Sequence, residues 1–259
     1  VFGLMDMINL AHGSLYMVGA YLIASIAQAT GSFWMGLGFG IVGAAVFGML
    51  LEISVFRRLY QRDHLSQVLG TFAILLMANE GVRLIWGSQP LSLNAPAELS
   101  GPVELFEGFY YPAYRLFIIG CGLVVAGLLY FLIAHTRIGM QVRAGASNRE
   151  MALAMGANVP RLFTAIFGLG AALCAVAGGM LGPLLSVQVG MGESILILAF
   201  VVIVIGGIGS IRGALLAALL IGVVDTFGKV LLPQASGVLV YVLMALILLW
   251  KPDGLFKAG

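Results

Sequence analysis

Long apolar runs separated by short polar connections dominate the hydrophobic pattern of this chain. A helix needs about 20 apolar residues to cross about 30 Å of hydrocarbon, and an open sheet would leave backbone groups unpaired in lipid. The alternating segments of about 10 residues that mark a membrane barrel are not seen in the pattern. We therefore predict an all-α fold, a polytopic transmembrane helix bundle of about eight spans. The expected spans are 11–30, 33–56, 65–86, 113–135, 162–185, 195–211, 214–232 and 237–250.

The first, sixth and last of these runs are short or interrupted by glycine, so we expect one or more short or broken helices. Composition agrees with a lipid environment. Of 259 residues, 61% are hydrophobic and 9% are charged, whereas an ordinary soluble domain carries roughly 25% charged residues. Cys121 and Cys174 both lie in apolar segments and are expected to behave as small buried hydrophobes. We predict a single transmembrane domain over 1–259 and, because no initiator Met opens the chain, an upstream segment before it.

Most Lys and Arg residues lie in alternate connections, which predicts the orientation because cytoplasmic loops are enriched in Lys and Arg. The basic set comprises 57–63 with Arg57, Arg58 and Arg62, 136–161 with Arg137, Arg143, Arg149 and Arg161, and the tail with Lys251 and Lys257. The connection 87–112 carries Glu98, Glu104 and Glu107 but no Lys or Arg, and the connection around Glu193 also lacks basic residues. We expect the basic loops and the C-terminus to be cytoplasmic, and the acidic connections to face the periplasm.

The loop 145–160, GASNREMALAMGANVP, has a polar start and a helix-favouring middle. Ser147 followed three residues later by Glu150 matches a capping box, and Gly156 stands where a left-handed helix cap is expected. The pattern predicts a helix of about three turns with Met151 and Met155 along one side. Exposed methionines suit docking into a partner groove because they repack easily. A short amphipathic connector lying on the membrane surface is the alternative.

Two polar interruptions of the apolar pattern are candidates for a translocation path. The first holds Asn9, His12 and Ser14 where a span begins. Polar groups at membrane depth face a bundle interior or an aqueous cavity, but Asn9 and Ser14 can also act as helix caps while His12 bonds a neighbouring carbonyl. The second interruption follows an apolar run of about 11 residues, which reaches only about 16 Å as a helix. Its small residues, Gly206, Gly207, Gly209 and Ser210, form either a reversal inside the bilayer or a cytoplasmic turn after a tilted full span.

Two pairs of opposite charges lie within apolar segments, Glu80 with Arg83 and Asp225 with Lys229. Spacings of three and four residues put each pair on one helix face, which favours structural neutralisation over a proton relay. No phosphate-binding loop and no metalloprotease or serine-hydrolase motif occurs in the sequence. No metal site is expected either. The chain therefore carries no catalytic motif, and if ATP drives the protein, another chain must bind it.

The segment Glu150-Met151-Ala152-Leu153-Ala154-Met155-Gly156 resembles the cytoplasmic Glu-Ala-Ala signature of ABC importer permeases, with Met151 in place of the first Ala. The wider stretches 8–21, 136–179 and 205–222 resemble the branched-chain amino-acid permease family. This resemblance implies that the loop helix couples the permease to its ATPases. The coupling residues would be Ser147, Asn148, Arg149, Glu150, Met151, Ala152, Met155 and Gly156.

The resemblance also implies a complete importer in a bacterial inner membrane. Its other parts would be two cytoplasmic ATPases that bind ATP and Mg²⁺, a second and related permease chain, and a periplasmic solute-binding protein. This chain would bind no cofactor, and its cargo would be leucine, isoleucine or valine. The alternatives are a urea or short-amide permease of the same family, an ion-coupled secondary transporter that uses the charge pairs, and an intramembrane enzyme or scaffold.

Overall fold

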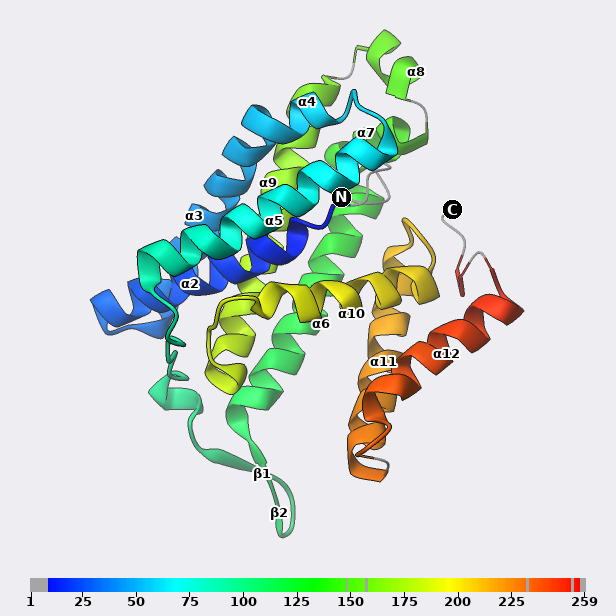
Figure 1. Cartoon of the computed structure of the whole chain (residues 1–259). Helices are drawn as coiled ribbons and strands as arrows, with labels where there is room; N and C mark the ends of the chain where they lie inside the picture. Colours follow the sequence, from blue (N-terminus) through cyan, green and yellow to red (C-terminus); the bar gives the residue numbers. More distant parts are fainter. Residues whose placement is uncertain (1–8, 148, 157, 232, 253, 257–259) are drawn as a thin grey trace.

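The computed structural model describes residues 9–147, 149–156, 158–231, 233–252 and 254–256, and nearly all of its secondary structure is helical (Figure 1). The helices that follow the apolar runs are α2 (His12–Thr30), α3 (Phe33–Leu51), α5 (His64–Trp86), α6 (Ala113–His135), α9 (Val159–Leu185), α10 (Met191–Gly206), α11 (Ile211–Leu231) and α12 (Ser236–Trp250). A π-helical turn (Glu52–Phe56) and the short α4 (Arg57–Leu59) extend α3 without a break.

Five of these helices are long and apolar enough to cross a membrane, namely Phe33–Leu59, His64–Trp86, Ala113–His135, Val159–Leu185 and Ile211–Leu231. The helices α10 and α12 are apolar but shorter, which agrees with the short runs in the sequence. A span was expected to continue to residue 211, but α10 ends at Gly206. The prediction of a polytopic helix bundle is confirmed.

The core of the molecule is the packing of α2 against α3 and α9, and small residues make it possible. A Cβ built on Gly36 would lie 2.7 Å from the backbone oxygen of Ile23, and one on Gly178 would lie 2.6 Å from that of Tyr16. Because neither position has a side chain, the helix backbones approach closely. The glycine spacings at 36/40 and 178/182 thus serve packing within the chain.

Contacts along α9 fix both the direction and the depth of α2. Leu15 clusters with Ala171, whereas Gly19 meets Ala175 four residues further on, so α2 runs parallel to α9. Ala171 is the thirteenth of the 27 residues of α9, about 18 Å along its axis. The helix α2 therefore begins beside the middle of α9. The sequence predicted a short or interrupted span over 11–30, and the fold shows that this helix starts deep within the bundle and is largely enclosed by its neighbours.

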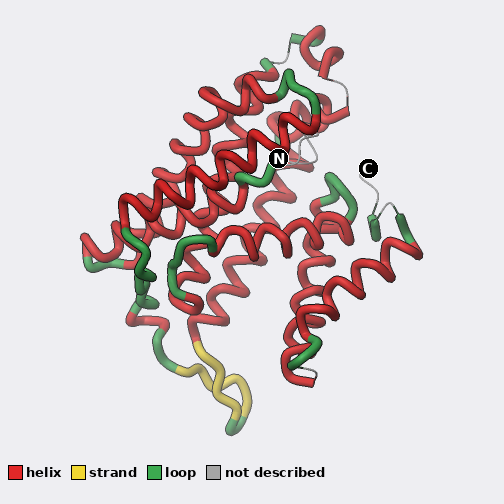
Figure 2. Tube along the Cα trace, in the orientation of Figure 1, coloured by secondary structure: helices red, strands yellow, loops and turns green. Residues whose placement is uncertain are grey.

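The connection 87–112 contains the strands β1 (Pro102–Phe106) and β2 (Phe109–Pro112), which pair as an antiparallel hairpin (Figure 2). The prediction of a purely helical fold missed this hairpin, whose strands are too short to show a clear alternation. The start of the connection is also anchored, because the backbones of Leu91 and Val187 exchange two hydrogen bonds. The hairpin lies at the opposite end of the molecule from the short helix α8 (Arg149–Ala154) (Figure 1).

Candidate functional site

The loop 145–160 holds the end of one helix, a second helix of six residues and the start of α9, instead of the single helix of about three turns that was expected. The helix α7 (Arg137–Ser147) ends where the predicted helix was to begin, and α8 covers only six residues. The prediction of Ser147 as an N-terminal cap of a three-turn helix is therefore wrong, because Ser147 is the last residue of α7. Asn148 lies outside the described residues, as do the side chains of Ser147, Arg149 and Glu150.

The helix α8 has one buried and one exposed side. Ala152 packs with Val159 and Phe163 of α9, whereas Met151 is 61% and Met155 is 81% exposed. The exposed methionines leave an adaptable apolar surface on the outside of the molecule, and the buried alanine fixes α8 to α9.

Gly156 ends α8 in the left-handed conformation, as the sequence predicts, with φ at 84°. Its N–H donates to the carbonyl oxygen of Leu153 at 3.0 Å. A Cβ placed on Gly156 would meet no atom within 4 Å. The requirement for glycine at this position is thus one of backbone conformation and not of space.

A buried carboxylate that the sequence analysis did not single out lies near this loop. Glu52 is fully buried in the π-helical turn that follows α3. Its Oε2 accepts a hydrogen bond from the Thr164 hydroxyl at 2.6 Å and one from Arg57 at 3.3 Å. Arg57 also donates to Thr164 at 2.9 Å. An acidic residue inside the apolar run 33–56 was the available sequence signal, and the fold supplies its partner from α9, 112 residues away.

The first polar interruption forms a compact turn before the start of α2. The Asn9 side-chain oxygen accepts from the Ala11 N–H at 3.0 Å, and its amide nitrogen lies 3.1 Å from His12 Nδ1. Asn9 does not cap α2 as expected, because the N-cap position is Ala11 and carries no side-chain cap hydrogen bond. The histidine bonds this side chain instead of a backbone carbonyl, and its ring contacts Phe167. Ser14 does not act as a cap; its buried hydroxyl has no hydrogen-bond partner among the described residues.

Asn9 and His12 line a cavity of ≈ 350 Å³ between α2, α9 and α10. Its walls are mostly aliphatic and aromatic, with Leu173 from α9 and Leu196 and Phe200 from α10. A volume of this size lies within the range of small-molecule sites, which are roughly 300–1,000 Å³. The cavity is located where α2 begins, beside the middle of α9.

The N-termini of α2 and α10 meet beside this cavity, although only the first turn of α2 lines it. The first turn of α2 touches the first turn of α10, because a Cβ on Gly13 would lie 2.6 Å from the backbone oxygen of Gly192. Both helices therefore point the positive ends of their dipoles toward one place. The sequence indicated the interruption at α2, but only the fold brings the start of α10 against it.

The second polar interruption forms a tight turn between α10 and α11. Gly207 and Gly209 have positive φ values of 93° and 83°, and the Ser210 hydroxyl accepts from the Gly213 N–H at 3.0 Å. The C-terminal tail covers this turn, since the Leu255 N–H donates to the Ile205 carbonyl at 2.8 Å. These contacts favour a turn at the side of the tail over a reversal at the cavity, and Gly206, Gly207, Gly209 and Ser210 do not line the cavity.

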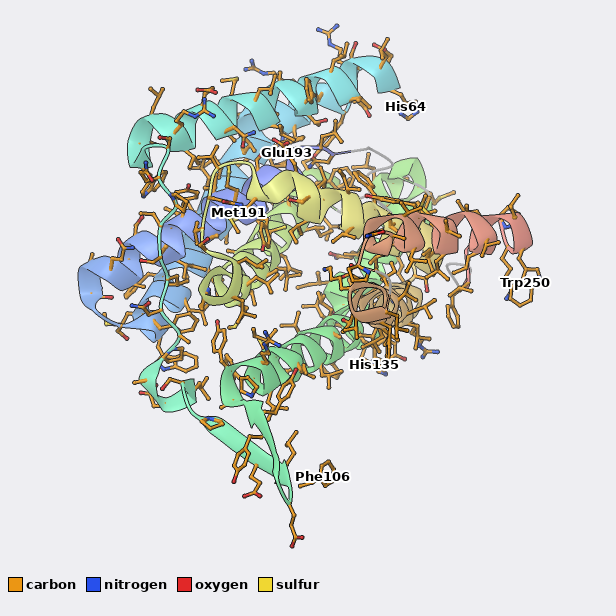
Figure 3. All side chains as sticks on the ribbon, turned by 60° about the horizontal axis from the view of Figure 1, so that its bottom comes forward. His64, Phe106, His135, Met191, Glu193 and Trp250 are labelled. Carbon is orange, nitrogen blue, oxygen red and sulfur yellow. The ribbon has the colours of Figure 1, made fainter. Side chains whose placement is uncertain are left out.

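The intramembrane charge pairs form as the spacing predicts. Arg83 lies 2.9 Å from Glu80, and Lys229 lies 2.6 Å from Asp225. Glu193 differs from the expectation, because it belongs to the first turn of α10 and not to an outer connection (Figure 3). Its carboxylate accepts from the Asn79 amide at 2.7 Å. Asn79 lies seven residues before the end of α5, about 10 Å inside that helix. Among the described residues, no cluster of potential metal ligands occurs.

Comparison with known proteins identifies the family of this chain. Residues 1–248 match the family described as the branched-chain amino acid transport system permease component. The chain is 32% identical to the high-affinity branched-chain amino acid permease protein BraD of Pseudomonas aeruginosa, over 98% of this chain and 87% of that protein. It is 30% identical to the corresponding LivH of Escherichia coli with the same coverage. LivM of Escherichia coli matches at 26% identity over 98% of this chain and 65% of that protein. No solved structure matches.

Proposed function

This chain belongs to the family of branched-chain amino acid transport system permease components, and from that membership we propose that it is the membrane subunit of an ATP-driven importer for leucine, isoleucine and valine. The match over residues 1–248 is the observation that carries the proposal. ATP and Mg²⁺ would bind to two partner ATPases, since the chain has no phosphate-binding loop of its own. The chain itself would hold no cofactor.

The partner ATPases would dock at α8. The exposed methionines, Met151 within α8 and Met155 directly after it, offer an apolar contact surface, and methionine adapts its shape to a partner groove. A force on α8 would pass through the buried Ala152 to Val159 and Phe163 of α9. The bond between Thr164 and Glu52 would then carry it from α9 to α3. This series of contacts from α8 through α9 to α3 supports a coupling role for the whole loop 145–160.

The translocation path would run past the cavity at the start of α2. Transporters place cargo near the middle of the bilayer, beside discontinuous helices whose N-terminal ends face the site. Asn9 and His12 line this cavity, and Ser14 lies in the same turn of α2. Access would alternate between the two sides as α9 moves with the ATPases. Gly206, Gly207, Gly209 and Ser210 would act as the hinge between α10 and α11.

The remaining partners follow from the orientation. We assign the end with α8 and the tail to the cytoplasm and the hairpin end to the periplasm, in agreement with the basic residues of 57–63 and 136–161. A periplasmic solute-binding protein would dock near Glu98, Glu104 and Glu107 of the connection 87–112. The similarity of this chain to both LivH and LivM of one organism supports a pair of related, non-identical permease chains.

The test is reconstitution of the complete importer. The chain is expressed with the ATPase, permease and binding-protein genes beside it, purified in mild detergent and placed in proteoliposomes. We expect an ATPase to co-purify and radiolabelled leucine to accumulate only with ATP on the ATPase side. Met155→Asp should lower ATPase retention, because it places a charge in the docking surface. The control is Phe106→Asp at the hairpin, where the replaced side chain is 76% exposed at the opposite end of the molecule.

Other outcomes would contradict the proposal in distinct ways. ATP-driven uptake of urea or a short amide without leucine uptake would overturn the cargo. Leucine movement down a proton or sodium gradient by the chain alone would overturn the ATP coupling. In that case, the pairs of Asp225 with Lys229 and Glu80 with Arg83 would become the groups to vary.

A further inference from the structure

We infer that the cavity between α2, α9 and α10 binds the cargo directly, with the carboxylate of an aliphatic amino acid at the N-terminus of α2 and its side chain against the apolar wall. This inference rests on the proposed function. It adds the contact residues and the chemistry by which they select a ligand.

The first turn of α2 supplies the site for the carboxylate. Gly13, in the first turn of α2, lines the cavity, whereas the residues of α10 that line it begin at Ile195, after the first turn of that helix. The first turn of a helix leaves backbone N–H groups without an intrahelical acceptor, and the dipole of α2 adds a positive potential there. A carboxylate is the part of an amino acid that such an arrangement attracts.

A buried hydroxyl gives an independent sign that a ligand belongs here. Tyr16 lines the cavity and is only 3% exposed, and its hydroxyl has no hydrogen-bond partner among the described residues. Leaving such a group unpaired inside a protein costs free energy. A ligand with ammonium and carboxylate groups could satisfy the hydroxyl either as donor or as acceptor.

The wall of the cavity selects the rest of the ligand. Leu173, Leu196, Phe200 and Ile203 give it an apolar surface, and none of the residues that line it is Asp, Glu, Lys or Arg. Burial of an unpaired charge against this wall is unfavourable, so acidic and basic amino acids are excluded. Urea and short amides have neither a carboxylate for the N-terminus of α2 nor an aliphatic group for the wall. The chemistry thus fits a zwitterion with a branched aliphatic side chain.

The first experiment removes one oxygen atom. In the reconstituted importer, Tyr16→Phe keeps the ring and deletes the hydroxyl, and ATP-driven uptake of radiolabelled leucine is measured at several concentrations of the loaded binding protein. We expect uptake to fall about five- to tenfold, as for loss of one hydrogen bond. The matched control is Tyr21→Phe, because Tyr21 is on the same helix and its buried hydroxyl also lacks a partner, but it does not line the cavity. The control should retain uptake within about twofold.

The second experiment changes the shape of the wall. Leu196→Ala enlarges the cavity and should raise the ratio of phenylalanine to leucine uptake, whereas Leu198→Ala, on the same helix but away from the cavity, should leave the ratio unchanged. The same binding protein serves every variant, so its own preference cancels from the comparison. Size-exclusion profiles and ATPase retention check that each complex is assembled.

These outcomes separate the inference from the proposed function. If the parent complex takes up leucine with ATP, but the Tyr16 and Leu196 variants match their controls, the cavity is not the cargo site and the importer proposal stands. If the parent complex retains no ATPase or does not take up leucine, the proposed function fails first.

Discussion

At the residue scale, the buried Glu52 links two helices whose sequences give no sign of the contact. Its carboxylate accepts from Thr164 on α9 and from Arg57, which follows it by five residues. Taking a carboxylate out of water is costly unless hydrogen bonds compensate. The pairing therefore makes the attachment of α3 to α9 specific near the loop that bears α8.

We expect Thr164→Val to weaken this attachment. The substitution nearly keeps the shape of the side chain but removes the hydroxyl that donates to Glu52 at 2.6 Å. A hydrogen bond to a charged group contributes roughly 1.5–3 kcal/mol, so the melting temperature of the detergent-solubilised protein should fall by several degrees. Thr226→Val is the control, because its hydroxyl donates to the Gly222 carbonyl in its own helix and has no other hydrogen-bond partner among the described residues. Equal melting temperatures for both variants would show that the Glu52 contact contributes little.

At the element scale, the end of α8 depends on backbone conformation and the α2–α9 pair depends on close approach. Gly156 has a left-handed φ with open space around it, whereas Gly178 has an ordinary helical conformation but no space. The two glycines thus respond to different substitutions, and each can be tested by itself.

For Gly156 we expect valine and asparagine to differ. A β-branched residue in the left-handed region is strained, whereas asparagine adopts that region readily. Gly156→Val should reduce leucine-stimulated ATP hydrolysis and uptake together, and Gly156→Asn should keep most of both. Rates of ATP hydrolysis and leucine uptake in proteoliposomes measure the difference. Equal activity of the two variants would show that the left-handed conformation at position 156 is not required for coupling.

For the helix pair, Gly178→Ala should destabilise the protein and Gly222→Ala should not. The new Cβ at position 178 would lie 2.6 Å from the Tyr16 backbone oxygen, while the one at position 222 meets nothing within 4 Å. Overpacking of this kind typically costs about 1–3 kcal/mol, and alanine in an open helix position is favourable. Thermal unfolding in detergent compares the two variants. A Gly178→Ala protein as stable as the parent would show that the helices separate easily.

At the scale of the whole molecule, the two ends of the bundle differ in secondary structure and in charge. One end carries the β1–β2 hairpin and the other carries α8 (Figure 1). The acidic residues of 87–112 and the basic residues of 136–161 belong to these opposite ends. The proposed import from a periplasmic donor to the cytoplasm requires such a division.

The orientation is tested by labelling from one side of the membrane. The native Cys121 and Cys174 are first replaced by alanine. Phe106→Cys and Met155→Cys are then introduced singly, because the side chains at positions 106 and 155 are highly exposed. In intact spheroplasts a membrane-impermeant maleimide should label position 106 but not position 155. Lysis should then expose position 155, which controls for its reactivity. Labelling of position 155 alone in intact cells would invert the assigned topology.

The sequence by itself determined the class of the protein and the approximate limits of its spans, because both follow from the free energy of placing apolar side chains in lipid. Local geometry was also readable in part, since Gly156 and the charge pairs at Glu80 and Asp225 involve residues within four positions of one another. The family resemblance pointed to the loop 145–160, although the helices there begin and end at other residues than expected.

Only the tertiary structure decided which distant groups meet. It placed the start of α2 beside the middle of α9, the first turn of α10 against Gly13, and Glu52 within reach of Thr164. Each of these contacts joins segments more than 100 residues apart, where hydrophobic periodicity carries no information about partners. The physical reason is that lipid selects apolar surface without regard to position, whereas small residues and shape complementarity determine which helices can approach.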